Sequence, residues 1–349
     1  MAIIDKPTDY FNTKLYTGTG SELAITGVGF QPDWTWIKGR NVAYDHNLFD
    51  VVRGVTKTIK SNKDDAESTQ AQMLKSFNSD GFTIGTDGAV NENDTRTYVA
   101  WNWKAGGSGS ANTDGSINTS STSVNTTAGF SISKYTGNAT NGATVGHGLG
   151  AVPDMIIGKD LGDTSSWGVW HKDLTNAGYR LALSSTAAQS DDSALFGGSS
   201  RTAPTSSVFS LGSGGGLNGN GSANIVYCFS GVQGFSKFGK YTGNGNANGT
   251  FIYTGFAPAF VIVKAISISG ENWQLNDNKR KTFNVNSTSL FPNLNNTEST
   301  DGMYIDMLSN GFKARETGNG TNGSGVSYIY MAFAENPFVA SNFNAATAR

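Results

Sequence analysis

The sequence of 349 residues is poor in the side chains on which disulfides, metal sites and thiol catalysis depend. Its one cysteine, Cys228, excludes an intrachain disulfide and leaves too few thiols for a structural zinc site. Its three histidines, His46, His147 and His171, lack the i, i+4 spacing of a helical metal motif. We therefore expect no bound metal and no cofactor, and a fold that is stabilised by packing.

Charge and long apolar runs are scarce as well. Charged residues make up 15% of the chain, the formal net charge is -2, and the lysines and arginines are scattered. A groove that neutralises many phosphates is therefore unexpected, so we predict no nucleic-acid partner. No segment approaches the ~18 consecutive apolar residues of a membrane span, and the run Ala2–Ile4 is too short for a signal-peptide core. We expect folding in a cytoplasm without membrane insertion.

Long stretches of alanine, leucine, glutamate, lysine and arginine are also absent, which argues against an all-α fold. The abundant residues are glycine, with 45 copies, and the aromatic residues, with 20 Phe, 12 Tyr and 7 Trp. This much aromatic surface is typical of a folded chain. Glycine and the Asn-Gly pairs between residues 141 and 323 favour short strands that are joined by tight turns.

Self-similarity divides the chain into three. The triplet Tyr-Thr-Gly recurs at Tyr16, Tyr135 and Tyr241. In each copy a lysine later follows a proline by six positions, in the pairs Pro32 and Lys38, Pro153 and Lys159, and Pro258 and Lys264. An aromatic-rich run closes each copy, at residues 98–101, 225–229 and 328–333. The constant spacing predicts three homologous units of roughly 100 residues, far longer than a solenoid repeat.

We predict an all-β fold of three tandem homologous antiparallel β-sandwich units with short connecting loops. The units span residues 1–105, 128–235 and 236–349. Residues 106–127 are almost only Gly, Ser, Thr, Asn and Ala, a composition that predicts a flexible linker. The first unit is then expected to move, while the second and third pack as a pair. One short helix is expected over residues 64–77, on the first sandwich.

Catalytic patterns are weak. Residues 234–240 have the glycine and lysine spacing of a phosphate-binding loop, but Tyr241 stands where the magnesium-binding Ser or Thr is required. Cys228 lies in an apolar run between two aromatic residues, which predicts an inert core thiol. Acidic residues are spread through loops, and no pair is marked for glycoside hydrolysis. We do not expect an enzyme.

Tryptophans offer the remaining candidate contacts. Trp34 and Trp36, like Trp101 and Trp103, are i, i+2 pairs whose rings share a strand face and are suited to stacking on sugars. Core packing is the favoured interpretation for the first pair, because aliphatic and aromatic residues replace it in the other copies; Trp103 has no such counterpart. The candidate surface or carbohydrate contacts are Trp103, Trp167, Trp170 and Trp273.

Several segments resemble a repeat of tail-fibre-like and other virion-surface proteins of tailed bacteriophages, marine phages above all. In the third copy these are YTGNGNANGTFIYTGFAPAFVIVKA and GSGVSYIYMAFAENPF, and in the first GFQPDWTWIKGR and TYVAWNWKA. The resemblance covers residues 10–105 and 236–338, and 129–232 more faintly. It implies a virion protein that is made in the host cytoplasm and displayed on the particle surface. It brings no catalytic motif.

Three functions follow as hypotheses. The first is a tail-fibre or tail-tip component for host-surface adhesion, which presents loops such as 212–221 and 318–325. The second is a capsid decoration or head-fibre protein, and the third a virion-associated polysaccharide-degrading enzyme. The expected partners are other phage virion proteins of the tail or capsid and a polysaccharide or protein of the host surface. A homo-oligomer is also expected, assembled through the sides of the sandwiches because heptads are absent.

Overall fold

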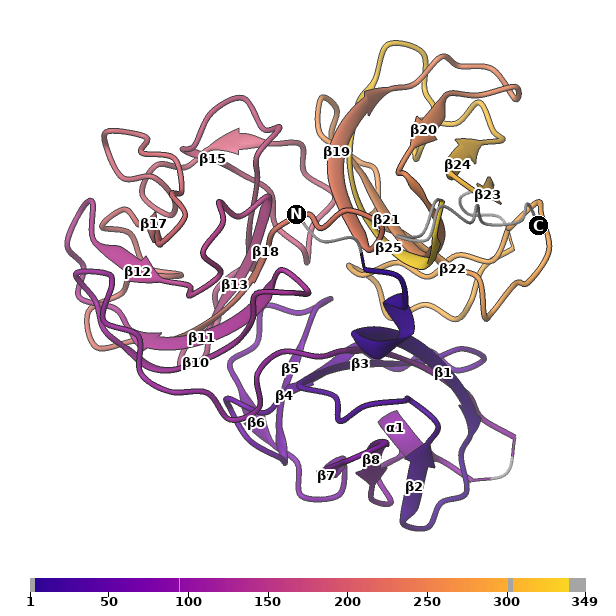
Figure 1. Ribbon diagram of the computed structural model, residues 1–349, viewed down its shortest axis with the longest axis horizontal. Coiled ribbons are helices and arrows are strands. Elements are labelled where there is room, and N and C mark those ends of the chain that lie inside the picture. The colour runs from indigo at the N-terminus through magenta and orange to yellow at the C-terminus, as the bar shows by residue number, and fades with distance from the viewer. Residues whose placement is uncertain (1–3, 94, 301–303, 339–349) are drawn as a thin grey trace.

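A computed structural model describes residues 4–93, 95–300 and 304–338. These residues are nearly all β, in several antiparallel sheets, which confirms the all-β expectation. The described helices are a short 3-10 helix η1 (Pro7–Asp9) and a four-residue helix α1 (Gly88–Asn91). Figure 1 shows the chain as three lobes around a common centre. We call them lobe 1 (residues 4–105), lobe 2 (106–235) and lobe 3 (236–338).

Lobe 1 has a six-stranded sheet in the order β1-β9-β3-β4-β5-β6 and a three-stranded sheet in the order β2-β8-β7. The strands are β1 (Phe11–Thr17), β2 (Leu23–Thr26), β3 (Trp34–Gly39), β4 (Asn47–Asp50), β5 (Lys57–Lys60), β6 (Ser68–Thr69), β7 (Leu74–Asn78), β8 (Gly81–Ile84) and β9 (Thr97–Trp103). A cluster of buried apolar residues, which includes Ile25, Ile37, Phe82 and Tyr98, joins the two sheets.

Lobe 2 has a five-stranded sheet in the order β10-β11-β18-β13-β14 and two small two-stranded sheets, β12-β17 and β15-β16. The strands are β10 (Thr119–Asn125), β11 (Phe130–Thr136), β12 (Thr144–Gly146), β13 (Met155–Asp160), β14 (Gly168–His171), β15 (Tyr179–Arg180), β16 (Ser190–Asp191), β17 (Val208–Ser210) and β18 (Ala223–Phe229).

Lobe 3 has a four-stranded sheet in the order β19-β25-β21-β22 and a three-stranded sheet in the order β20-β24-β23. The strands are β19 (Ser236–Thr242), β20 (Phe251–Tyr253), β21 (Phe256–Ala265), β22 (Gln274–Asp277), β23 (Ile305–Leu308), β24 (Gly311–Ala314) and β25 (Ser327–Pro337). In each lobe the larger sheet pairs the strand that contains the repeated lysine with the aromatic strand that closes the copy. These antiparallel pairs are β3 with β9, β13 with β18, and β21 with β25.

The three lobes share one hydrophobic core. One face of each larger sheet packs inside its own lobe, and the other face is turned toward the centre, where the three sheets meet (Figure 1). Aromatic contacts cross every seam, with ring-centroid distances of 4.6 Å for Trp34–Tyr227, 5.5 Å for Trp103–Phe260 and 6.1 Å for Phe229–Phe333. The expectation that lobe 1 moves while lobes 2 and 3 form a pair is therefore wrong. Lobe 1 contributes four tryptophans to the common core.

The seams are equivalent, so the lobes form a closed ring with approximate threefold symmetry. One backbone hydrogen bond recurs at all three, to the carbonyl two residues after the repeated lysine: Glu67 N to Leu161 O (3.0 Å), Gln189 N to Ile266 O (3.1 Å), and Glu298 N to Arg40 O (2.7 Å). Each lobe donates to the next in the same direction. The symmetry explains why strands of the larger sheets are apolar on both faces: one face packs inside the lobe and the other in the ring core.

The segment 106–127 is not a flexible linker. Its β10 pairs antiparallel with β11, and the Ile117 side chain packs in the core of lobe 2. The Ile117 N–H donates to the Thr144 carbonyl at 2.9 Å, so the segment also closes the edge of β12. Small hydroxyl side chains made the composition resemble a spacer, but here they bond to one another inside the sheet, as in the 2.9 Å contact of Thr122 with Ser133.

The helix expected over residues 64–77 is also wrong. Residues 68–69 form β6, and residues 74–78 form β7, which pairs with β8. Leu74 lies opposite Ile84, and Phe77 opposite Phe82, so pairing with a buried neighbouring strand takes the apolar residues that suggested a helical face. Tertiary pairing outweighs a weak local helical pattern in so short a segment.

The Tyr-Thr-Gly mark holds, by hydrogen bonds, a loop that lies far from it in the sequence. In each lobe its tyrosine hydroxyl donates to the carbonyl that precedes a buried asparagine: Tyr16 to Val90 (2.8 Å), Tyr135 to Leu217 (2.8 Å) and Tyr241 to Thr321 (2.7 Å). The asparagines, Asn91, Asn218 and Asn322, bond in turn to the loop after the mark. The mark's glycine is required by close approach, because a Cβ at Gly18 would lie 1.9 Å from the Glu92 carbonyl oxygen.

Replacement of Asn322 by alanine is expected to destabilise lobe 3 by about 2–3 kcal/mol, because several backbone groups lose their partner in a buried site. The Asn322 amide donates to the carbonyls of Asn246 and Glu316, both at 2.7 Å. Urea denaturation measures the change. Asn319→Ala in the same loop is the control, since Asn319 is exposed and should change stability by less than about 0.5 kcal/mol. Equal effects of the two substitutions would contradict the assignment.

The repeated lysines lie one residue before the ends of strands β3, β13 and β21, and their side chains are inside the protein. Lys38, Lys159 and Lys264 are fully buried, and each Nζ donates to the carbonyl of the next residue at 2.6–2.8 Å. Burial lowers the pKa of Lys38 and of Lys264 to about 8. The proline-to-lysine spacing is constant, although the strand that contains the lysine is longer in lobe 3 than in lobes 1 and 2.

Candidate functional site

The four tryptophans that the sequence offered as surface contacts are all buried. Trp103, Trp167, Trp170 and Trp273 have exposed fractions of 1%, 0%, 6% and 1%. Two of them tie lobes together: Trp167 Nε1 donates to the Lys60 carbonyl of lobe 1 at 2.9 Å, and Trp273 Nε1 to the Ala182 carbonyl of lobe 2 at 3.0 Å. The expectation of carbohydrate contact at these residues is corrected, because no ligand reaches a ring enclosed in a seam or core.

The histidines and the cysteine are likewise enclosed. His46, His147 and His171 are fully buried, and burial lowers the pKa of each. Burial raises the pKa of the Cys228 thiol far above its usual range, in keeping with an inert core residue. His171 occupies the position of Asp50 and Asp277 in the other lobes, because each lies opposite the residue two positions after the repeated proline.

Stability is expected to fall as the pH is lowered below about 6.5, through His171. Burial, and then the charge of Lys172, lower its pKa to about 3 in the folded protein. The unfolded chain binds a proton at the usual pKa, so between these values protonation favours unfolding, by about 1.4 kcal/mol per pH unit. Urea denaturation at pH 7 and pH 5 measures the loss. His171→Asn should make the slope shallower; an unchanged slope would contradict the prediction.

The loops 212–221 and 318–325 have buried bases and exposed tips. Asn218 and Asn322 anchor the bases, while Ser213, Asn220 and Ser324 are exposed. They are thus surface segments held on a fixed support, as the sequence suggested, and their exposed side chains are small.

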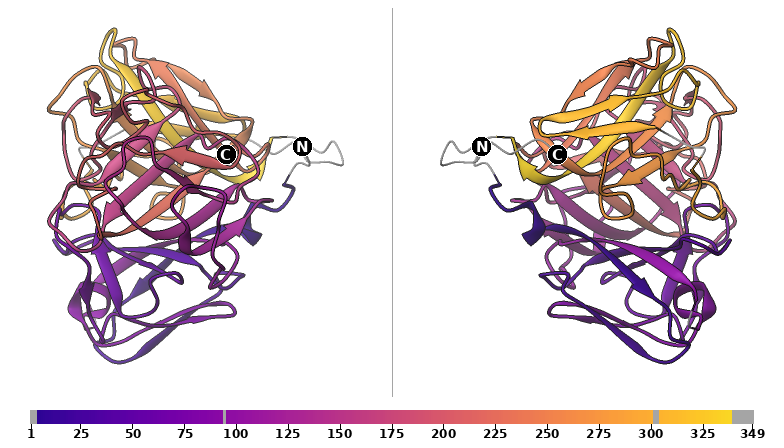
Figure 2. Two further views of the ribbon diagram at one scale, coloured as in Figure 1. Left: turned by 90° about the vertical axis from the view of Figure 1, so that its left-hand side faces the viewer. Right: turned by 90° about the vertical axis from the view of Figure 1, so that its right-hand side faces the viewer.

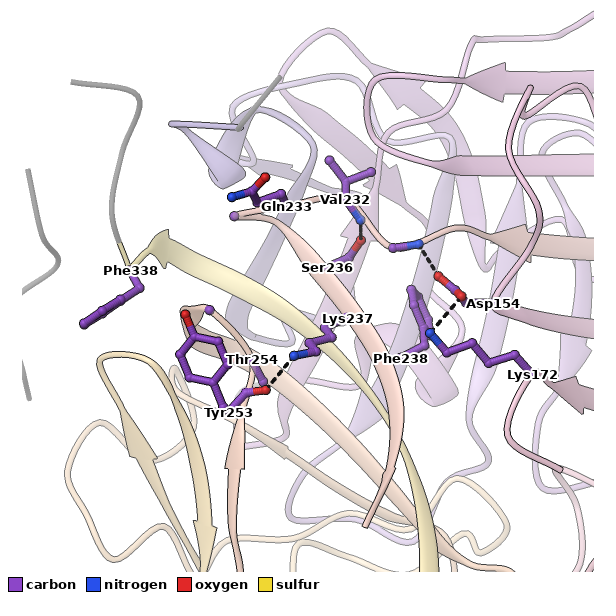
Figure 3. A pocket seen from close by; sticks show the side chains of 13 residues that line it. Asp154, Lys172, Val232, Gln233, Ser236, Lys237, Phe238, Tyr253, Thr254 and Phe338 are labelled. Atoms are coloured by element: carbon purple, nitrogen blue, oxygen red, sulfur yellow. Dashed lines mark hydrogen bonds and ion pairs between the residues drawn. The ribbon is translucent and has the colours of Figure 1, made fainter. Parts of the chain in front are cut away.

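A groove lies at the seam of lobes 2 and 3, and Figure 3 shows it from close by. A cavity of about 530 Å³ adjoins a second of about 410 Å³. We call the two together the seam groove. Both are lined by Lys172 of lobe 2 and by Lys237, Phe238 and Tyr253 of lobe 3. Strand β19 runs along the groove from end to end, since residues 236–241 all line it.

Lysines and aromatic rings share the walls. Lys237 Nζ donates to the Tyr253 carbonyl at 2.8 Å and lies 5.1 Å from the centre of the Tyr253 ring (Figure 3). Burial and the nearby Lys172 lower the pKa of Lys237. Tyr253 is 52% exposed and Phe251 44%, which sets them apart from the aromatic residues of the core. Two large rings therefore border the groove with half of their surface open to a partner.

On the opposite wall, Lys172 Nζ lies 3.0 Å from the Asp154 carboxylate, which also accepts the Gly231 N–H at 2.5 Å. Burial raises the pKa of the neighbouring Asp173, although Lys172 and Lys240 oppose the shift. Three lysines and two carboxylates thus line the groove, which leaves it slightly positive at neutral pH.

Comparison of the sequence with known protein families gives one match. The model of a domain of unknown function, DUF7483, matches residues 6–337. The chain belongs to the DUF7483 family. No curated protein and no solved structure matches it. The family match runs through all three lobes, so DUF7483 corresponds to the whole ring with its common core and not to one of the repeats.

The chemistry of the seam groove in this DUF7483 chain follows from its lining residues. In the described part of the chain no group of three or more His, Cys, Asp or Glu side chains is placed to hold a metal ion. Asp154, the one carboxylate among the described residues that line the larger cavity, is held by Lys172 and a backbone amide. What the groove offers a ligand is a strand edge, lysine charge and two half-exposed rings. None of the described helices is long and apolar enough to cross a membrane.

Sequence reasoning on the DUF7483 chain found only part of this site. Residues 234–240 drew notice for a nucleotide-like spacing, and the structure makes most of that segment β19. No sequence motif pointed to Lys172 or Tyr253, because two residues that meet across a seam between lobes share no pattern in the local sequence. The segment 119–125 precedes the Tyr-Thr-Gly mark in the second copy, but the apolar run 225–229 lies at a similar distance before the third mark, so the sequence hides the difference between the two copies.

Proposed function

We propose that this DUF7483 chain is a structural protein of a bacteriophage virion, a tail-fibre or tail-tip component that contributes to adhesion to the host surface. It acts by binding and not by catalysis. Each lobe is, in this proposal, a two-layer antiparallel β-sandwich, and the three tandem sandwiches form one rigid body. The resemblance of the repeats to virion-surface proteins supports the assignment.

The observation that carries the proposal is the common core. A single core of residues from all three lobes fixes the relative positions of loops that lie far apart in the sequence. The chain reaches this rigidity without a disulfide, since Cys228 is its only cysteine. A rigid support with polar loops at several points suits a protein that must hold its shape on a particle surface while its loops contact a receptor.

Electron cryo-microscopy of the virions that carry this gene product, labelled with an antibody against the protein, tests the proposal. Label at the tail is the expected result. Label over the head would replace it with the capsid decoration or head-fibre function, and absence of label from the particle would refute the virion assignment. Turnover of host polysaccharide that is lost with one Asp or Glu substitution would instead establish an enzyme.

A binding assay tests adhesion separately. The full-length protein is expected to bind host cells, and lysine substitutions at the exposed tips Ser213 and Asn220 to weaken that binding. Ser120→Lys is the control, because Ser120 is also exposed but lies outside both loops. Binding that all three substitutions leave unchanged would contradict a role for the loop 212–221.

A further inference from the structure

Strand β19 has an open edge where the equivalent strand of lobe 2 is covered. In lobe 2, β10 pairs with β11 on one side and β18 with β11 on the other. In lobe 3, β19 is the counterpart of β11 and, among the described strands, pairs only with β25. Aligned on the Tyr-Thr-Gly marks, Phe238 corresponds to Ile132 and Lys240 to Lys134. No described strand therefore fills, beside β19, the space that β10 fills in lobe 2.

The direction of the backbone groups is fixed by the bonds at the two ends of β19. The Phe235 carbonyl accepts from Ala334 N–H at 2.7 Å, and Gly243 N–H donates to the Val326 carbonyl at 2.9 Å. Odd-numbered residues thus bond to β25, so Phe238 and Lys240 direct their N–H and C=O groups to the open edge. No described residue hydrogen-bonds to these four groups. Their counterparts in lobe 2, Ile132 and Lys134, face β10.

The vacant edge coincides with the seam groove. Residues 236–241 of β19 line it, Lys172 and Asp173 of lobe 2 form one wall, and residues 251–253 of β20 the other. In lobe 2, the segment 116–125 occupies the corresponding space, pairs with both β11 and β12, and inserts Ile117 into the core. The pairing of β10 with β11 in lobe 2 therefore shows how an added strand could pair with the edge of β19.

We propose that the β19 edge receives an extended, acidic segment of a partner protein, which adds an antiparallel strand as β10 does in lobe 2. Backbone bonds to Phe238 and Lys240 provide the pairing, and Lys237, Lys240 and Lys172 select acidic side chains. Lysine on an open edge disfavours pairing with a second copy, which would bring like charges together across the strands. The proposal holds whether or not the protein is a virion component, because it depends only on the edge of β19 and the groove beside it.

A peptide assay with the full-length protein tests the proposal. The parent peptide is residues 117–126 of this chain, which contains β10. The acidic peptide carries Ser121→Asp and Val124→Asp, the positions that would oppose Lys240 and Lys237 in the β10 register. Calorimetry is expected to detect the acidic peptide binding about fivefold more tightly than the parent. N-methylation at positions 121 and 123 should abolish binding, because it removes the two N–H groups that face β19.

Protein variants locate the binding. Lys240→Pro removes an outward N–H without breaking a bond to β25, a change that edge strands tolerate, and should weaken binding at least about tenfold. Leu15→Pro, at the equivalent outward position of β1, is the matched control and should leave binding unchanged. Lys240→Ala keeps the N–H and should weaken binding less than the proline. If Lys240→Pro does not fold, the N-methylated peptide still decides between strand pairing and simple charge attraction.

Three results would overturn the proposal. The first is no binding of either peptide up to about 1 mM, or binding that N-methylation leaves unchanged. The second is a dimer in analytical ultracentrifugation that Lys240→Pro dissociates, which would make a second copy the occupant. The third is an anionic polysaccharide that binds the groove, competes with the peptide and loses affinity equally with Lys240→Ala and Lys240→Pro, which would make charge alone the basis of binding.

Discussion

Trp34→Ala is expected to destabilise all three lobes together, by about 3–5 kcal/mol, although Trp34 belongs to lobe 1. The Trp34 side chain is fully buried in the ring core, with its ring centroid 4.3 Å from that of Trp103 and 4.6 Å from that of Tyr227 in lobe 2. Truncation leaves a cavity where lobes meet. Guanidinium denaturation measures the free energy of unfolding, and hydrogen exchange reports protection lobe by lobe.

Loss of protection should reach β24 in lobe 3 and β17 in lobe 2, because a common core makes unfolding cooperative. The control is Phe283→Ala, since the Phe283 side chain is 80% exposed and its removal should change stability by less than about 0.5 kcal/mol. Loss of protection confined to lobe 1, or separate unfolding transitions for the lobes in the unmodified protein, would show that the ring core is not a cooperative unit.

Arg53→Met is expected to cost about 3–5 kcal/mol, because it leaves a buried carboxylate without its cation. Arg53 Nε lies 2.5 Å from Asp50 Oδ2, and both side chains are fully enclosed. The Tyr227 hydroxyl of lobe 2 donates to the same oxygen at 2.7 Å, so the pair also stabilises a seam. Lobe 3 repeats the pair as Asp277 and Arg280, with Trp101 of lobe 1 as the donor at 3.1 Å. Thermal and urea denaturation measure the loss.

A second change distinguishes an unpaired charge from lost packing. Asp50→Asn in the Arg53→Met background should recover part of the stability, since the amide needs no counter-charge. The control for charge removal is Lys75→Met at the exposed pair with Glu22, 2.6 Å apart, which should cost less than about 1 kcal/mol. Equal losses at the buried and the exposed pair would mean that the position of the charge in the seam is unimportant.

The sites that sequence reasoning missed share one physical cause. Trp167 and Trp273 carry a polar N–H on a large apolar ring, a pattern that suits an exposed sugar contact as well as a buried seam. Their partners are backbone carbonyls of the preceding lobe, more than 90 residues away in the chain, and no local signal marks a carbonyl as an acceptor. Lys172 and Lys237 were ordinary surface lysines in sequence and become a site only because two lobes meet at β19.

The amino-acid sequence by itself determined the all-β class and the threefold repetition. Short runs of β-branched and aromatic residues, glycine-rich turns and a constant proline-to-lysine spacing are local features, and local features fix strands and turns. The tertiary structure alone decided what packs against the face of each larger sheet that is turned away from its own lobe. These contacts buried the tryptophans, paired residues 119–125 and 74–78 as strands, and left β19 with an open edge among the described strands. Each of these outcomes depends on the closing of three lobes around one core, because burial and pairing are properties of neighbours that the chain brings together only when it folds.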